Sequence, residues 1–197
     1  HLRGGRSNEV AYWVDGMPIT DGYDGSTVID INKDSIREMQ LISGSFNAEY
    51  GQAMSGIVNI TTNEGNNNFG GSIDFYSGDF ISDHTNLYTN LNHIDLLSTH
   101  NFNFNAHGSI IKNKLYYYLS GRYVYYQGVY EGQRLYNSSS YGSIEEEDDQ
   151  SYWDVYGDNV GDGKYIPMEW NLKQSGQLNL IWKPTQTTKI KYSHFAD

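Results

Sequence analysis

The sequence contains no cysteine, only 3 prolines and no long apolar run. Without cysteine the chain has no disulfides, no thiolate metal ligands and no cysteine nucleophile. Basic residues are also scarce, because 13 lysines and arginines stand against 24 acidic residues, and a net charge of -11 argues against a nucleic-acid partner. Apolar runs such as residues 115–119 are far shorter than the roughly 18 residues of a transmembrane helix. If the chain crosses a membrane, we therefore expect a β-barrel.

The N-terminal part, residues 1–62, predicts a small α+β unit. A strand-forming run ends in an Asp15–Gly16 turn, since Asp-Gly is a common pair in tight hairpins. Asp34 is placed to cap a short helical turn. Two further strands are expected, at residues 39–42 and 57–61.

A linker and a different pattern follow. Residues 63–71, NEGNNNFGG, favour turns and extended backbone over helix. In residues 72–197 polar and apolar residues alternate with period two, which predicts about five antiparallel strands. Phe102 and Phe104, for example, share one face, whereas the neighbouring asparagines and His107 share the other.

The connections between these strands also alternate in length. Residues 112–114 and 184–187 form short turns, whereas residues 79–100 and 129–171 form long polar loops. This layout is typical of an outer-membrane β-barrel, whose turns lie on one side and whose loops lie on the other. A soluble antiparallel sandwich also alternates, but it needs a denser aliphatic face than this sequence offers.

Four motifs together resemble the TonB-dependent outer-membrane receptors. They are RGG at residues 3–5, VDGMPI at 14–19, IREMQLISG at 36–44 and AEYGQAMSGIVNITT at 48–62. The resemblance covers the C-terminal part of the plug domain and the first barrel strands, and it favours the large receptors that carry a carboxypeptidase-regulatory-like domain. Two departures are Ser55–Gly56 in place of Gly-Gly and Thr62–Asn63 in place of Thr-Lys.

The resemblance implies a plug inside a barrel of about 22 strands. Such a barrel needs roughly 500 residues or more, so we expect this chain to be a fragment. The small residues of the last motif, such as Gly51 and Gly56, would let the plug backbone lie close to its neighbours.

By the same resemblance, the protein imports a scarce extracellular ligand and is energised by a TonB-type protein. Its other partners would be outer-membrane lipids and, as an open alternative, a lipoprotein subunit. The plug loops that would touch the ligand correspond here to Arg6, Asn8, Asp21, Tyr23 and Asp24. Arginine offers a planar fork for anions and tyrosine a stacking face. The alternative for each residue is a plain solvated loop.

An acidic segment, residues 143–163, carries eight carboxylates. Carboxylates on glycine-rich loops can gather Ca²⁺, and the candidate ligands are Asp154, Asp158 and Asp162, although their spacing does not match an EF-hand. Tyr152, Trp153 and Tyr156 could form an aromatic platform for a sugar or peptide. A solvated outer loop explains the same residues.

Catalytic motifs are missing from the sequence. It has no nucleophile elbow, zinc-protease motif or phosphate-binding loop, and its 6 histidines lack metal-ligand spacing. We therefore expect no enzyme and no cofactor. Two other functions stay open: a structural or binding β-barrel component of a larger outer-membrane assembly, and a secreted glycan-binding or adhesion β domain. The ligand itself could be a siderophore, an oligosaccharide, a peptide or cobalamin.

Overall fold

The computed structural model describes residues 9–43, 55–138, 141–147, 150–156 and 161–197. It divides into two compact units. The first comprises His1–Tyr76, Asn101–Val124 and Lys173–Asp197, and the second comprises Ser77–His100 and Tyr125–Leu172. In this described part of the chain, no helix is both long and apolar enough to cross a membrane.

The first unit opens with a four-stranded sheet in the order β2-β1-β4-β3. Its strands are β1 (Val10–Val14), β2 (Met17–Pro18), β3 (Ile36–Ile42) and β4 (Gly56–Thr62). β1 runs parallel to β4, and the other two pairings are antiparallel. Val14, Ile19 and Ile60 form its buried core.

The predicted hairpin turn joins β1 to β2. Asp15 and Gly16 have φ angles of 50° and 84°, and the type I′ turn requires positive φ at both central positions. Glycine adopts this conformation freely, and aspartate is among the few other residues that tolerate it.

The helical turn expected near Asp34 is a 3₁₀ helix of three residues, Lys33–Ser35. Its cap is Asn32 rather than Asp34, because the Asn32 side chain accepts the N–H of Asp34 at 3.2 Å. The prediction of Asp34 as the cap was therefore wrong by two residues. The described part of residues 1–62 contains no α-helix, so the α+β unit is almost entirely strand.

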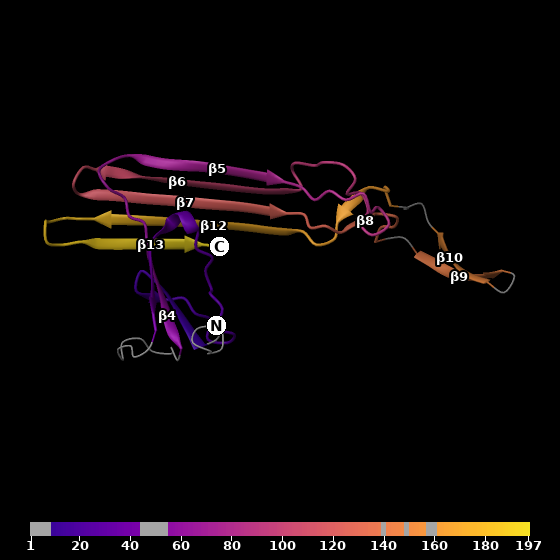
Figure 1. Ribbon diagram of the computed structural model, residues 1–197, viewed down its shortest axis with the longest axis horizontal. Coiled ribbons are helices and arrows are strands. Elements are labelled where there is room, and N and C mark those ends of the chain that lie inside the picture. Colours follow the sequence, from indigo (N-terminus) through magenta and orange to yellow (C-terminus); the bar gives the residue numbers. More distant parts are fainter. Residues whose placement is uncertain (1–8, 44–54, 139–140, 148–149, 157–160) are drawn as a thin grey trace. The chain divides into compact units, whose positions relative to one another are not determined.

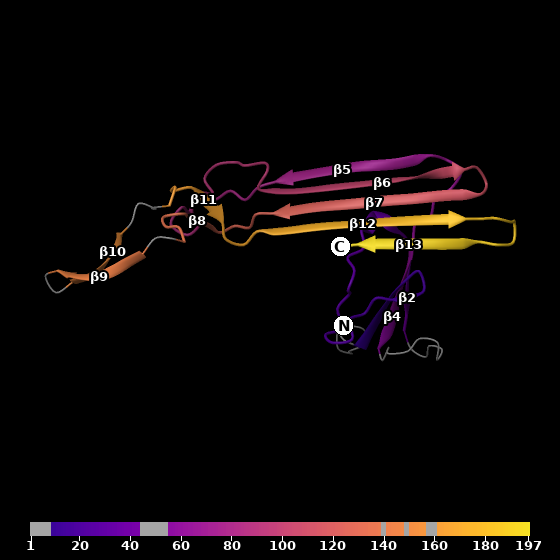
Figure 2. The same cartoon turned by 180° about the vertical axis from the view of Figure 1, so that it is seen from behind.

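The second sheet of the first unit holds five long strands, which Figures 1 and 2 show side by side in the order β13-β12-β7-β6-β5. They are β5 (Gly70–Gly78), β6 (Thr99–Ile111), β7 (Leu115–Tyr126), β12 (Asn171–Trp182) and β13 (Ile190–Ala196). We call this five-stranded sheet the wall sheet, and residues 9–62 the plug-like segment. All five strands lie where alternation predicts them.

The two faces of the wall sheet have inverted polarity. Asn103, Ser120 and Asn179 are buried, and they belong to the predicted polar face. Large apolar side chains of the other face are exposed: Ile73, Phe75, Ile110, Trp182, Ile190 and Tyr192. A soluble sheet with one buried face has the opposite arrangement.

The second unit contains the two long loops. Residues 129–171, which the sequence predicted as a polar loop, contain two antiparallel strand pairs. One pair is β8 (Glu131–Gln133) with β11 (Tyr165–Pro167), and the other is β9 (Tyr141–Glu147) with β10 (Gln150–Tyr156). In the other loop, the Asp79 carboxylate accepts the N–H groups of Phe80 and Asp95 and the hydroxyl of Ser98. These bonds join the two ends of the loop.

Candidate functional site

The predicted ligand loop around Tyr23 is closed by its own aspartates. Asp21 accepts the N–H of Tyr23 at 2.7 Å, and Asp24 accepts the N–H of Ser26 at 2.8 Å. Hydrogen bonds from the side chain and backbone of Ser26 lower the pKa of Asp24. Tyr23 itself is 98% exposed, so it is free to stack on a ligand. The role of these three residues stays a prediction, and Arg6 and Asn8 lie outside the described residues.

Most residues of the predicted aromatic platform and calcium site lie outside the part of the chain whose side chains the structure describes. Tyr152, Trp153, Asp154 and Tyr156 belong to β10, whose side chains are outside the described structure, as is all of Asp158. Asp162 is described, and it pairs with Arg134 at 3.2 Å and Lys164 at 3.7 Å. The backbone N–H of Lys164 and both cations lower the pKa of Asp162. Among the described residues, no group of three or more His, Asp or Glu is placed to hold a metal ion.

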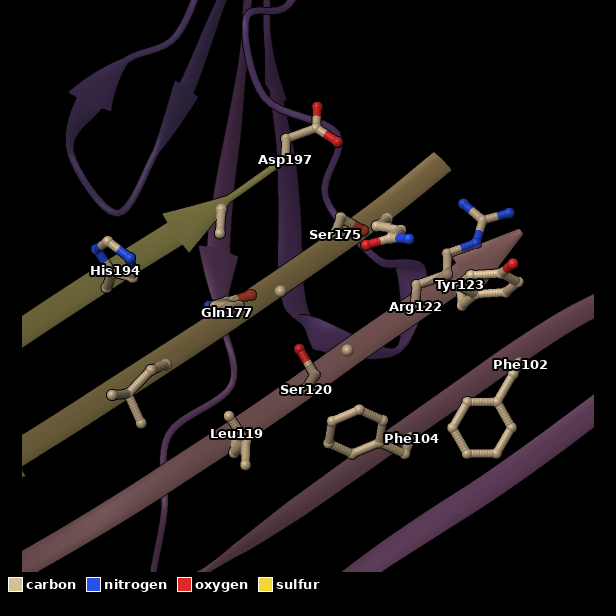
Figure 3. A pocket seen from close by; sticks show the side chains of 15 residues that line it. Phe102, Phe104, Leu119, Ser120, Arg122, Tyr123, Ser175, Gln177, His194 and Asp197 are labelled. Carbon is tan, nitrogen blue, oxygen red and sulfur yellow. The ribbon is translucent and has the colours of Figure 1, made fainter. Parts of the chain in front are cut away.

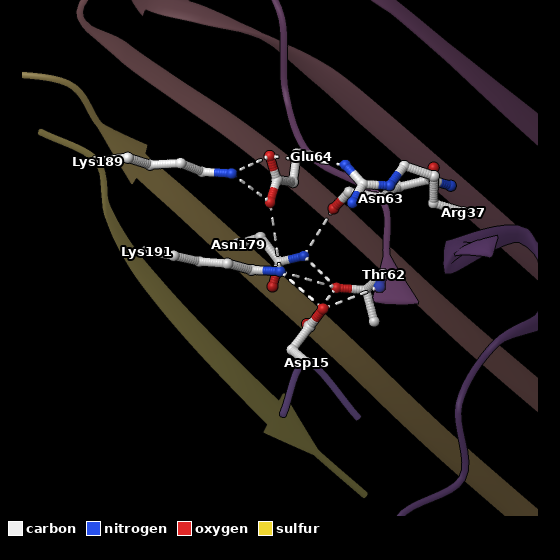
Figure 4. A network of polar contacts seen from close by, with 8 residues as sticks. All are labelled: Asp15, Arg37, Thr62, Asn63, Glu64, Asn179, Lys189 and Lys191. Atoms are coloured by element: carbon white, nitrogen blue, oxygen red, sulfur yellow. Dashed lines mark hydrogen bonds and ion pairs between the residues drawn. The ribbon is translucent and has the colours of Figure 1, made fainter. Parts of the chain in front are cut away.

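A polar network joins the plug-like segment to the wall sheet, and Figure 4 shows its eight residues. Asp15, from the β1–β2 turn, lies at its centre with only 7% of its side chain exposed. The Asp15 carboxylate accepts the N–H of Thr62 at 3.0 Å and the Thr62 hydroxyl at 2.5 Å. It also pairs with the ammonium of Lys191 on β13 at 2.9 Å. The turn is thus tied both to β4 and to a wall strand.

Asn179 of β12 makes a second connection. Its Nδ2 donates to the Thr62 hydroxyl oxygen at 2.8 Å and to the carbonyl oxygen of Asn63 at 2.7 Å. Asn179 is fully buried, so water cannot readily replace these bonds. Since the Thr62 hydroxyl donates to Asp15 and accepts from Asn179, the three side chains form one chain of hydrogen bonds.

Glu64 extends the network with a cluster of opposite charges. Its carboxylate lies 2.8 Å from Lys189, 3.7 Å from Lys191 and 3.8 Å from Arg37. Lys189 and Arg37 are about half exposed, so each of these pairs contributes little, of the order of 0–1 kcal/mol. The buried end of the network at Asp15 therefore carries most of the specificity with which the plug-like segment docks on the wall sheet.

The ionisation of Asp15 follows from opposing effects. Burial raises the pKa of the carboxyl, but the hydrogen bonds from Thr62 and the charge of Lys191 outweigh it. The net result is a lowered pKa, so Asp15 is ionised at neutral pH. The plug-like segment thus holds a buried carboxylate whose counter-charge comes from the wall sheet.

Further contacts between the two parts include an exposed ion pair of Lys173 with Asp30 at 3.9 Å and several uncharged hydrogen bonds. The hydroxyls of Ser35 and Ser120 lie 2.7 Å apart, and Tyr118 donates to the Asp34 carbonyl oxygen at 3.0 Å. Phe195 of β13 packs against the core of the plug-like segment. The polar face of the wall sheet is therefore buried largely through bonds with this segment.

The opposite face of the wall sheet bears an open groove of about 620 Å³, seen in Figure 3. Its apolar lining includes Phe104, Leu119 and Leu178, with His194 at one side. The ring of Phe104 lies against Gly121, where any Cβ atom would collide with it. Glycine at this position thus leaves room for the Phe104 ring against the strand.

Sequence reasoning did not identify the polar network. It assigned Asp15 to a turn and Lys191 to an alternating strand, and both assignments agree with the structure. The only signal was the Thr62–Asn63 pair, which departs from the usual Thr-Lys; here the carbonyl oxygen of Asn63 accepts the buried Asn179 amide.

Comparisons with known proteins agree with this architecture. No family model matches the chain. It is 26% identical over 125 residues to the TonB-dependent transporter Oar of Myxococcus xanthus, which covers 59% of this chain and 12% of that protein. The crystal structure of the siderophore receptor PirA from Acinetobacter baumannii matches 97% of this chain and 24% of that chain, with a TM-score of 0.56 and 20% identity.

The likeness to PirA shows that the chain has the fold of part of a siderophore receptor chain. The similarity to Oar supports the resemblance to TonB-dependent receptors, whereas the predicted subfamily has no such support. Both relatives are named for transport or reception rather than catalysis, in agreement with the prediction that the chain is no enzyme. The chain spans about an eighth of the transporter and a quarter of the receptor chain.

Proposed function

We propose that this chain is the plug end and the first wall strands of a TonB-dependent outer-membrane receptor of a Gram-negative bacterium, which imports a scarce extracellular ligand. The observation that carries the proposal is the inverted polarity of the wall sheet. Its polar face is buried against the plug-like segment, and its apolar face is exposed. A barrel wall with lipid outside and a plug inside requires this arrangement.

In this function the polar network holds the plug in place. Asp15, Thr62 and Asn179 connect the plug-like segment to two neighbouring wall strands, β12 and β13. A TonB-type protein would have to break these bonds, directly or through strain, before the ligand could pass. The exposed Tyr23 loop would contribute to ligand recognition.

The first experiment is to identify the native polypeptide in membrane fractions and to compare its electrophoretic mobility with and without boiling. We expect a large outer-membrane band whose mobility changes on heating, because closed barrels resist unfolding in detergent. Uptake of candidate siderophores, with and without the energising protein, then tests import. A soluble species near 22.4 kDa would overturn the proposal and favour the secreted β domain. A heat-modifiable band without energised uptake of any candidate would favour the structural or binding barrel.

A further inference from the structure

A small cavity lies where the capped 3₁₀ turn meets the wall sheet. Residues 30–32 of the plug-like segment line one side, and Ser120, Ser175, Gln177 and Phe195 line the other. Its volume is about 10 Å³, which is close to the space that one water molecule occupies. Ser120 and Gln177 also border the groove described above, and Figure 3 shows the side chains of Ser120 and Leu119 pointing to opposite sides of their strand.

Two buried amide groups line this cavity without a hydrogen-bond acceptor. Asn32 is 8% exposed and Gln177 is 6% exposed. Within the described part of the chain, neither Asn32 Nδ2 nor Gln177 Nε2 has a hydrogen-bond partner. The orientation of Asn32 is fixed, because its Oδ1 accepts the N–H of Asp34 as the helix cap. Flipping the amide would break the cap, so the free donor must face away from it.

A buried amide without a partner is costly, since it has lost its hydrogen bonds to water. Buried waters usually satisfy such groups, and each needs two to four polar partners. This cavity offers two donors, one from each side, together with the hydroxyls of Ser120 and Ser175 as acceptors. The apolar alternative, an empty void, is typical of cavities lined by aliphatic side chains.

We propose that a single ordered water molecule occupies this cavity and bridges Asn32 of the plug-like segment to Gln177 of the wall sheet. Its oxygen accepts from both amides, and its hydrogens donate to the neighbouring serine hydroxyls. The contact between the two parts therefore combines directly bonded charges at Asp15 with a hydrated end at Asn32.

The hydrated end has a consequence that rests on the proposed import function. When the plug-like segment withdraws, Asn32 and Gln177 exchange one bound water for bulk water. Neither amide is therefore left without a hydrogen-bond partner. The direct bonds at Asp15 and Asn179 must break before water can replace them, so we expect the hydrated end to open more easily.

The direct test is a structure of the intact protein at a resolution that shows ordered waters elsewhere. We expect density about 2.7–3.2 Å from both Asn32 Nδ2 and Gln177 Nε2. Absence of that density, or a direct bond between the two side chains, would overturn the proposal. This result is independent of import, because a protein that transports nothing can still hold the water.

A second test uses the sign of a stability change. Gln177→Met keeps the length of the side chain and removes its amide; Gln174→Met makes the same change at an exposed site on the same strand. If the water is present, Gln177→Met removes one of its hydrogen-bond partners and weakens the link to the Asn32 donor. Hydrogen exchange in residues 30–38 should then accelerate by roughly fivefold or more. An empty cavity predicts slower exchange, because a buried unpaired amide is removed. Gln174→Met should leave exchange unchanged.

Discussion

Replacing Lys191 with methionine tests the polar network most directly. Methionine keeps most of the length of lysine and removes its charge. The change leaves the Asp15 carboxylate buried with two hydrogen bonds from Thr62 and no counter-charge. The expected consequence is local opening of the contact between the β1–β2 turn and the wall sheet.

The size of the effect follows from burial. Removing one partner of a fully buried ion pair costs about 3–5 kcal/mol, whereas an exposed pair is worth about 0–1 kcal/mol. Asp15 is 7% exposed and Lys191 is 21% exposed, with 2.9 Å between the charged atoms. The pair therefore lies between these limits, and Thr62 still supports the carboxylate. We expect a loss of about 2 kcal/mol, which corresponds to a roughly 30-fold change in an equilibrium constant.

Hydrogen exchange of the intact protein in detergent measures this loss locally. The reporter is a peptide that contains the Thr62 amide, because that N–H donates to Asp15. We expect its exchange to accelerate about 30-fold in Lys191→Met. Lys189→Met is the matched control: that lysine is 47% exposed and, in the described part of the chain, pairs with Glu64, so exchange should change by no more than about fivefold.

A double substitution separates the charge pair from packing. Asp15→Asn keeps an acceptor for Thr62 and tolerates the positive φ of the turn. In the double variant, Lys191→Met should add little further acceleration, because the uncompensated charge is gone. If Lys191→Met alone leaves exchange within about threefold of the wild type, the proposed counter-charge role is wrong.

Three further predictions follow from single sites. Because the pKa of Asp15 is lowered, its contribution to stability is complete above the unfolded value of about 3.9 and is lost as pH falls through the lower value of the folded protein. The difference in thermal midpoint between wild type and Asp15→Asn should therefore begin to shrink as pH falls below about 4 and should vanish only below the lowered pKa of the folded protein. Gly65→Ala should reduce stability by about 3 kcal/mol and lower the folded yield, since its Cβ would collide with backbone oxygens of Tyr117 and Gly108, whereas Gly22→Ala, in open space, should fold normally. Asp79→Ala should make proteolysis of residues 79–98 about tenfold faster by removing three hydrogen bonds, and unchanged cleavage would refute its role in closing that loop.

Much of the fold could be predicted because it depends on local chemistry. The Asp15–Gly16 pair specifies a hairpin turn, and period-two alternation specifies strands and their faces. The cap at Asn32 was harder to predict, because Asn32 and Asp34 can both cap a helix and lie only two residues apart. The strand pairs within residues 129–171 were missed because that segment lacks clear alternation.

The polar network could not be predicted from the sequence for a different reason. Asp15 and Lys191 are 176 positions apart, and alternation shows only that Lys191 lies on the polar face. Which residue of the plug-like segment meets which wall residue depends on how the two parts dock. The structure of the predicted ligand loop could not be read from the sequence either. Asp21 and Asp24 accept hydrogen bonds from the backbone of their own loop, and Tyr23 is almost fully exposed.

The polarity of the wall sheet also limits the surroundings in which it is stable. Ile73, Phe75, Ile110 and Trp182 are each half exposed or more, and full burial of one such side chain is worth about 1.5–3 kcal/mol. When several of these side chains stay in water, the lost stabilising free energy is comparable to the whole free energy of unfolding of a typical domain, about 5–15 kcal/mol. The polar face cannot compensate, because its buried amides already need partners from the plug-like segment. We infer that an apolar medium on one side and a polar plug on the other suit this sheet better than water on both sides.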